Sequence, residues 1–197
     1  MKRVNLRNVN DFENLIYHLT RYKFVARILS KKDIVIEIGC GHGYGTYFLS
    51  KYCQKIVGID IDSDIINQCK KEYGSKNLDF KCLNILDTDI TKFPKYDVVV
   101  CFEVIEHMNR KEAYKLMEKL KDLKKDDGII FLSTPRRIED KFKTENRRKF
   151  HMHEYTYEEL NEDLSKIFSR FIILGQLDEI IGSLNPNNVW TYFCICW

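Results

Sequence analysis

Four glycines occupy alternate positions in one short stretch, and this spacing limits the possible fold more than any other feature of the sequence. They lie in VIEIGCGHGYGT at Gly39, Gly41, Gly43 and Gly45, although the chain has only nine glycines in 197 residues. The run 33–38 (DIVIEI) is apolar from Ile34 onward except for Glu37, which predicts a short buried strand, and 44–53 has helical spacing. A strand, a glycine-rich turn and a helix typically bind a ligand, because glycine allows close approach and the helix N-terminus offers free N–H groups.

The rest of the chain alternates between predicted strands and helices. Further strands are predicted at 55–60, 78–83, 96–102 and 129–134, and helices at 11–29, 62–73, 113–123 and 157–168. The first helix has a candidate N-cap at Asp11 or Asn10. This alternation predicts an α/β fold with a mostly parallel sheet and helices on both faces. The segments 170–177 and 189–197 are strands with no helix between them, so we expect a terminal antiparallel hairpin at the edge of a seven-stranded sheet.

The composition is that of one globular domain. Hydrophobic residues make up 44% and charged residues 31%, and no linker separates a second domain. The net charge of +3 is too small to indicate nucleic-acid binding by itself. The seven cysteines include no C-x-x-C pair, so we expect reduced thiols. We also expect a cytoplasmic protein, because residues 1–30 form an N-terminal helical segment without a signal-peptide pattern and no run is long enough to span a membrane.

The glycine spacing excludes two common phosphate-binding loops. A P-loop requires a lysine followed by serine or threonine after its glycines, and none follows here. The dinucleotide pattern G-x-G-x-x-G/A fails in both registers, because Tyr44 and Thr46 occupy its last position. The pattern that remains, E-x-G-x-G-x-G, places a carboxylate beside the loop, which suits a ligand with a positive charge.

This pattern resembles motif I of the class I S-adenosylmethionine-dependent methyltransferases, and the resemblance extends over nearly the whole chain. It implies a Rossmann-like fold in a single domain, 1–197, that binds S-adenosylmethionine. By this resemblance Glu37 lies near the amino group of the cofactor and orients the loop, and Asp60 binds the ribose hydroxyls. Asp60 could instead cap the next helix, although Asp62 and Ser63 are better placed to do so.

The resemblance also assigns residues further along the chain. Asn84 stands where the family usually has an acid beside the adenine, and its side chain can still accept a hydrogen bond there. The predicted cofactor-binding residues are Glu37, Gly39, Cys40, Gly41, Gly43, Asp60, Ile61, Asn84, Ile85 and Phe102.

A second group of functional residues follows the strand 96–102, in the spacing E-x-x-E-H. Glu103 and Glu106 would meet across one helical turn, and with His107 and a later histidine they could hold a divalent cation such as Mg or Mn. The candidate metal ligands are therefore Glu103, Glu106, His107 and His151. Alternatively His107 is a general base, or Glu106 and His107 simply begin a helix in the pocket wall. The family shows this spacing in small-RNA 2′-O-methyltransferases, ubiquinone-pathway O-methyltransferases and methyltransferases of sugar clusters.

The segment 135–156 is longer than a normal connection, which predicts a substrate loop. Within it, 136–149 carries seven basic and three acidic side chains, a charge that either faces solvent or attracts a phosphorylated acceptor. His151 and His153 follow, and they lie on one face if the chain is extended. The candidate catalytic residues are His107, His153, His151 and Glu106.

The resemblance is strongest to small enzymes of glycan-modification clusters, through RYKFVARIL, GYGTYFLS, STP and FHMHEYTYEEL. It implies O-methylation of a sugar, a nucleotide-sugar or another small metabolite hydroxyl. The alternative is a metal-dependent RNA 2′-O-methyltransferase, which would need aromatic stacking platforms and a wider basic surface. A catalytically silent module is disfavoured, because both the glycine loop and Asp60 are intact.

Overall fold

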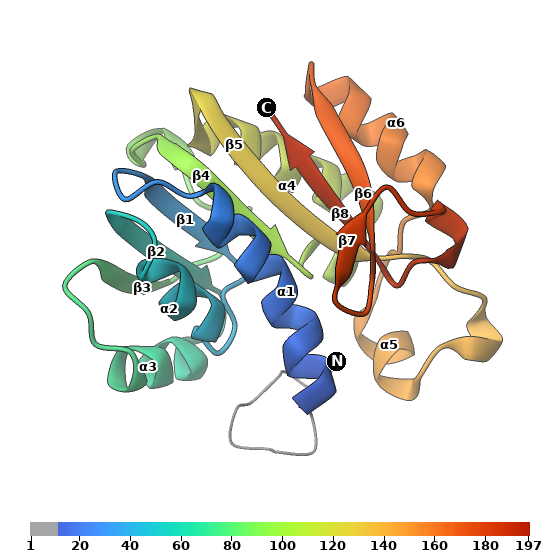
Figure 1. The fold of residues 1–197 in the computed structure, drawn as a ribbon, viewed down its shortest axis with the longest axis horizontal. Helices are drawn as coiled ribbons and strands as arrows, with labels where there is room; N and C mark the ends of the chain where they lie inside the picture. The colour runs from blue at the N-terminus through green and yellow to red at the C-terminus, as the bar shows by residue number, and fades with distance from the viewer. Residues whose placement is uncertain (1–11) are drawn as a thin grey trace.

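The computed structural model describes residues 12–197, which form an eight-stranded sheet with helices on both faces (Figure 1). The helices are α1 (Phe12–Ile28), α2 (Tyr44–Ser50), α3 (Ser63–Glu72), α4 (Arg110–Leu123), α5 (Glu145–Phe150) and α6 (Tyr157–Ile167). The strands are β1 (Ile34–Ile38), β2 (Lys55–Asp60), β3 (Leu78–Cys82), β4 (Tyr96–Phe102), β5 (Lys124–Pro135), β6 (Phe171–Leu177), β7 (Ile180–Gly182) and β8 (Thr191–Cys196). The predicted N-cap at Asp11 or Asn10 lies outside the described residues.

The strand order is β3-β2-β1-β4-β5-β8-β6-β7. Strands β1 to β5 pair in parallel, whereas β8 is antiparallel to both of its neighbours, β5 and β6. The predicted α/β fold with a mostly parallel sheet and an antiparallel C-terminal pair is confirmed. Two details differ from the prediction: β7 is an eighth strand, and β8 lies inside the sheet while β6 and β7 form its edge.

Alternating side chains of the central strands divide the core between the two faces. Val35, Val98 and Val100 pack with α1 and α2 on one face. Ile36 and Val99 point to the other face, where they pack with α4 and α6. Figure 1 shows α1 crossing one face of the sheet and α4 lying behind the other.

Helices α1 and α2 meet at the fourth glycine of the loop. A Cβ atom on Gly45 would lie 2.1 Å from the ring of Tyr22 in α1, so only glycine allows this approach. This contact brings α1 against the end of the sheet that carries the glycine loop. The site described below depends on that placement.

Candidate active site

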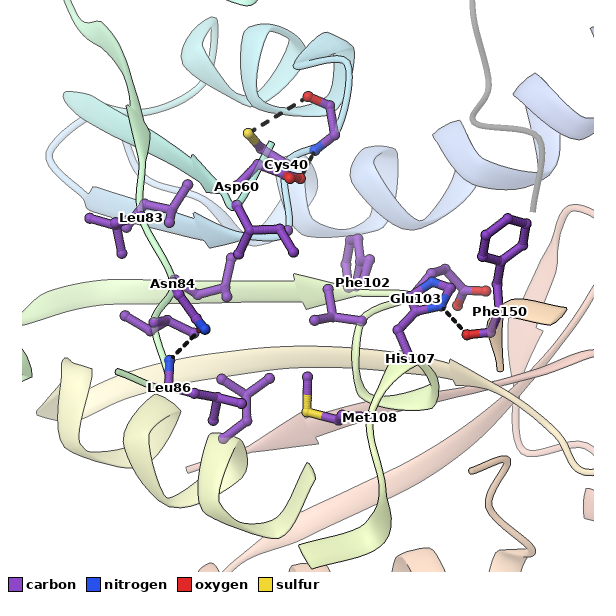
Figure 2. Close-up of a pocket in the computed structure, with 18 of the residues that line it drawn as sticks. Cys40, Asp60, Leu83, Asn84, Leu86, Phe102, Glu103, His107, Met108 and Phe150 are labelled. Carbon is purple, nitrogen blue, oxygen red and sulfur yellow. Dashed lines mark hydrogen bonds between the residues drawn. The ribbon is translucent and has the colours of Figure 1, made fainter. Parts of the chain in front are cut away.

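A cavity of about 1100 Å³ opens at the carboxyl ends of β1, β2 and β4. This is the switch point of the sheet, because β1 has β2 on one side and β4 on the other. The glycine loop, Asp60, residues 83–86 and residues 102–104 contribute to its wall (Figure 2). This volume slightly exceeds the usual range for small-molecule sites, so there is room for more than a small metabolite alone.

The glycines of the loop serve both packing and ligand access. Gly39, Gly41 and Gly43 all have positive φ, at 76°, 50° and 73°. A Cβ on Gly39 would lie 2.3 Å from Cγ2 of Val104, and one on Gly43 would lie 2.8 Å from Sγ of Cys69. A Cβ on Gly41 would meet no atom within 4 Å, and Gly41 lines the cavity. The open space beside Gly41 is therefore available to a bound molecule.

Glu37, at the end of β1 just before the glycine loop, forms hydrogen bonds to both α1 and α2. Its carboxylate accepts hydrogen bonds of 2.5 Å from the hydroxyls of Tyr22 in α1 and Thr46 in α2. The side chain is 1% exposed, and this burial raises the pKa of Glu37 to about 7. Glu37 is not one of the residues that line the cavity, so its predicted contact with the cofactor amino group stays a prediction.

Asp60 connects β2 to the glycine loop and lines the cavity. Its carboxylate accepts hydrogen bonds from the backbone N–H groups of Gly41, at 2.9 Å, and Asp62, at 3.1 Å. The cap of α3 is instead Asp62, whose side chain accepts from the N–H groups of Asp64 and Ile65. Asp60 is therefore not a helix cap and faces the ligand space.

Residues after β2 and β3 form an apolar part of the wall. Ile61, which is 70% exposed, and Ile85, which is buried, both line the cavity. The Asn84 side chain accepts a hydrogen bond from Leu86 N–H and donates one to the Asp87 carboxylate, and these contacts fix its orientation. Cys40 and Phe102 also line the cavity and are buried, and their predicted contact with the cofactor stays a prediction.

His107 lines this cavity, and its Nε2 lies 3.9 Å from the buried Glu106 carboxyl group. Its Nδ1 lies 2.9 Å from the Phe150 carbonyl oxygen, which only accepts hydrogen bonds, so Nδ1 carries the hydrogen (Figure 2). Nε2 of the neutral ring is then an acceptor. Burial lowers the pKa of His107, which favours this neutral form. His107 can therefore accept a proton or bind a cation at Nε2.

Three of the predicted residues form a cluster beside the cavity. Glu106, His107 and His151 each offer one ligand atom, and these atoms lie within 4.8 Å of one another. Within residues 12–197, Oε1 of Glu106 and Nε2 of His151 are buried without a hydrogen-bond partner. The Nδ1 of His151 lies 2.7 Å from the Glu154 carboxylate, an arrangement that commonly orients metal-binding histidines. The donors thus fit a divalent cation.

The carboxyl group of Glu106 favours its protonated form in the folded protein. Burial raises the pKa of Glu106 well above its usual range, and the nearby Glu103 adds to this effect. A cation would replace the proton on this carboxyl group.

Glu103 does not join the cluster, in contrast to the prediction. Its carboxylate accepts a hydrogen bond of 2.9 Å from the Ser133 hydroxyl and lies 3.7 Å from the guanidinium of Arg21. The backbone of Glu103 has φ of 55°, and residues 105–107 form a short 3₁₀ helix. This geometry replaces the expected helical turn, and Glu103 contacts Ser133 and Arg21 instead of joining the cluster.

His153 also lies apart from the cluster. Its Nε2 is 3.4 Å from the Glu159 carboxylate, and its ring packs edge-on against Tyr155. His151 ends α5 while His153 is in the following loop, so the two side chains do not share the face expected of an extended chain. Its predicted catalytic role has no support from this geometry.

The basic side chains of 136–149 mostly hold their own segment together. Arg137 donates to the Glu154 carbonyl at 2.7 Å and to the Glu159 carboxylate at 2.8 Å. Arg147 bonds to the Glu154 carboxylate and to the Arg136 carbonyl. The ends of the segment meet at a bridge between Arg136 and Tyr155. The attraction of a phosphorylated acceptor stays a prediction, because these guanidinium groups are already engaged.

The structure adds residues that the sequence did not suggest. His18 and Tyr22 of α1 line the cavity, as do Phe150 and Met152 of the segment 135–156. The helical spacing of His18 and Tyr22 was visible, but nothing in the sequence shows which face of α1 meets the glycine loop. All seven cysteines are free thiols. Among the described residues, no helix is both long and apolar enough to cross a membrane.

The chain is similar to known methyltransferases in both sequence and fold. Residues 36–130 match the family model of a methyltransferase domain. A ubiquinone biosynthesis O-methyltransferase of Glaesserella parasuis is 29% identical over 51% of this chain and 44% of that protein. A probable S-adenosylmethionine-dependent methyltransferase of Mycobacterium tuberculosis is 25% identical over 65% of this chain and 45% of that protein. The chain thus spans less than half the length of these two curated relatives.

Solved structures of other methyltransferases share the fold. The crystal structure of the small RNA methyltransferase HEN1 superimposes with a TM-score of 0.71 and 22% identity, covering 91% of this chain and 25% of that one. This likeness concerns the architecture of the sheet and helices.

Proposed function

Since the chain belongs to the class I S-adenosylmethionine-dependent methyltransferases, we propose that it transfers a methyl group to a hydroxyl oxygen of a small metabolite, such as a sugar or nucleotide-sugar. The observation that carries this proposal is His107, a residue of the cavity wall whose Nδ1–H donates to the Phe150 carbonyl and leaves Nε2 as an acceptor. A hydroxyl group loses its proton as it attacks, and a fixed acceptor beside it serves that purpose.

The cofactor would lie across the carboxyl ends of the strands. The space beside Gly41 accommodates its methionine part, and Asp60, at the end of β2, faces the ribose. Ile61 and Ile85 offer apolar surfaces to the adenine, next to Asn84. Each of these residues lines the same cavity, which supports their assignment as one binding site.

S-adenosylmethionine supplies an electrophilic methyl group on a positively charged sulfur. The chain contributes mainly alignment, by holding donor and acceptor in one enclosed cavity. His107 accepts the acceptor proton at Nε2, and its ring keeps its orientation because Nδ1–H donates to the Phe150 carbonyl. Phe150 and Met152 add apolar surface to this end of the cavity wall.

Calorimetry with S-adenosylhomocysteine tests the proposal. The wild-type protein should bind, and Asp60→Ala should abolish measurable binding because it removes both the ribose partner and the bond to Gly41 N–H. Asp64→Ala is the matched control, since Asp64 lies in the first turn of α3 and does not line the cavity. Absence of binding by the wild-type protein would rule out the proposed activity.

A second candidate function is a metal-dependent RNA 2′-O-methyltransferase, favoured by the cluster of Glu106, His107 and His151. These three residues would hold a divalent cation, and the Glu154 carboxylate would orient His151. Such an ion supplies Lewis-acid chemistry toward a hydroxyl oxygen.

Methyl-transfer assays separate the two candidates. If a metal is required, a chelator should abolish transfer, manganese should restore it, and His151→Ala should raise the manganese concentration needed. Activity that is unchanged by a chelator would exclude this second candidate. A steep loss of acceptor affinity with salt would favour RNA over a small metabolite.

A further inference from the structure

The wall of the cavity on the α1 side holds a second imidazole with the opposite hydrogen-bonding character. His18 lines the cavity, and its Nδ1 lies 2.6 Å from a terminal nitrogen of the Arg21 guanidinium. A guanidinium only donates hydrogen bonds, so Nδ1 of His18 must accept. The hydrogen of the neutral ring is therefore on Nε2, whereas in His107 it is on Nδ1.

Nε2–H is the polar atom that His18 can offer to a ligand. Arg21 is fully buried and lies behind the cavity wall, so the Nδ1 edge of the ring faces the protein interior. Within residues 12–197, Nε2 of His18 has no hydrogen-bond partner. Burial, and then the charge of Arg21, lower the pKa of His18 to about 4, so the ring remains a neutral donor at physiological pH.

The same guanidinium connects His18 to a carboxylate in the cavity. While one terminal nitrogen of Arg21 bonds to His18, the other lies 3.7 Å from Glu103 Oε1 and donates to Gln176 at 3.0 Å. Glu103 lines the cavity, and the Ser133 hydroxyl fixes its Oε1. The buried Arg21 guanidinium thus contacts both the His18 ring, which is a hydrogen-bond donor at Nε2, and the Glu103 carboxylate, which is an acceptor.

Neighbours of Glu103 and His18 in the chain pack against the glycine loop. Val104, which follows Glu103, is the residue that approaches Gly39 most closely. Tyr22, one helical turn after His18, donates to Glu37 immediately before the loop. Oppositely charged groups of a ligand held against this loop would therefore meet a donor on one side and a carboxylate on the other.

We infer that His18 and Glu103 bind the amino-acid end of S-adenosylmethionine, with His18 donating from Nε2 to the carboxylate and Glu103 accepting from the ammonium group. Arg21 is the positioning residue for both. This inference rests on the proposed function, since it concerns how the same cavity holds its cofactor. It assigns Glu103 to the cofactor instead of to the metal cluster.

Binding of two ligands by calorimetry tests the inference. S-adenosylhomocysteine carries the amino-acid end, and 5′-methylthioadenosine lacks it. His18→Leu should weaken S-adenosylhomocysteine about 10-fold, the worth of a hydrogen bond to a charged group, and leave 5′-methylthioadenosine unchanged. His18→Gln can donate from its amide and should stay within about 3-fold of wild type. Glu103→Gln should also weaken only S-adenosylhomocysteine.

Each other outcome has a definite meaning. Equal weakening of both ligands by His18→Leu, or no change in either, would overturn the inference while leaving the proposed function intact. A change confined to the KM of the acceptor would overturn it as well, because His18 would then contact the acceptor. Failure of the wild-type protein to bind either ligand would instead contradict the proposed function. Retained binding of 5′-methylthioadenosine shows that each variant is folded.

Discussion

The glycines with positive φ differ in what surrounds them. Gly39 and Gly43 are enclosed by side chains of Val104, Cys69 and Phe80, whereas Gly41 faces open space in the cavity. The first two are needed for the fold, and the third is free to serve a ligand. Sequence spacing alone cannot make this distinction, because it depends on residues distant in the chain.

Substitution by alanine should separate these roles. Gly43→Ala combines positive φ with a steric clash and should lower the free energy of unfolding by about 3 kcal/mol. Gly41→Ala should cost only about 1 kcal/mol of backbone strain, yet weaken S-adenosylhomocysteine roughly 10-fold or more. Urea denaturation and calorimetry provide the two measurements. Equal losses of stability in both variants would contradict the assignment.

Burial of Glu37 makes stability depend on pH. Its pKa is raised from 4.5 to about 7 in the folded protein, so the folded state favours the protonated form. The stabilisation is fully present below pH 4.5 and is lost as the pH rises through 7. Relative to Glu37→Gln, the wild-type free energy of unfolding should fall by on the order of 2–3 kcal/mol between pH 4.5 and 8. A constant difference across this range would show that Glu37 stays ionised.

At the scale of elements, the segment 135–156 depends on one buried carboxylate. Glu154 bonds to Arg147 of α5 and to His151, and it lies 3.6 Å from Lys143. Burial alone would raise the pKa of Glu154, but the hydrogen bonds from His151 and Arg147 outweigh it and hold the pKa at about 2. Glu154 therefore links α5 to the end of the segment, where Tyr155 pairs with Arg136.

Removal of this carboxylate should loosen the segment without unfolding the sheet. In Glu154→Gln, amide hydrogen exchange at 139–151 should become faster by at least about 10-fold, while β1 and β4 stay protected. Glu145→Gln, an exposed change in the first turn of α5, is the control. In the wild type the same loosening should occur as the pH falls from 4.5 toward 2. Unchanged exchange in Glu154→Gln would show that the guanidinium contacts to carbonyls suffice.

The elements that the sequence predicted are those with long periodic patterns. Strands β1, β2 and β4 and helices α4 and α6 follow from apolar runs of the right period. Strand β7 was missed because Ile180–Gly182 is too short to show alternation. Helix α5 was missed because ENRRKF is polar, although Thr144 caps it by accepting from Arg147 N–H.

The candidate site was predictable only where it is local in sequence. The glycine loop was recognised by its spacing and Asp60 by the family resemblance, and both lie at strand ends and line the cavity. The cluster of Glu106, His107 and His151 was partly recognised, but Glu103 was misplaced because its positive φ redirects the chain. His18 and Arg21 could not be foreseen, since their role depends on how α1 packs across the sheet.

At the scale of the whole molecule, one continuous sheet carries a layer of core side chains on each of its two faces. The apolar clusters on its two faces are joined through the central strands, so we expect one cooperative unfolding transition. S-adenosylhomocysteine at about 100 times its dissociation constant should stabilise the protein by about 2.7 kcal/mol and raise the melting temperature by several degrees. Calorimetry that resolves two transitions, only one of them sensitive to the ligand, would contradict a single domain.

The order of the strands has a consequence for synthesis on the ribosome. Strand β8 leaves the ribosome after β6 and β7, yet it lies between β5 and β6 and pairs with both. Until residues 191–196 emerge, β6 has no strand through which to join the sheet, and β5 presents an open edge. Open edges promote aggregation. A nascent chain that stalls before β8 would therefore hold a nearly complete cavity beside an unprotected sheet edge, so premature termination should yield aggregates instead of a partly active enzyme.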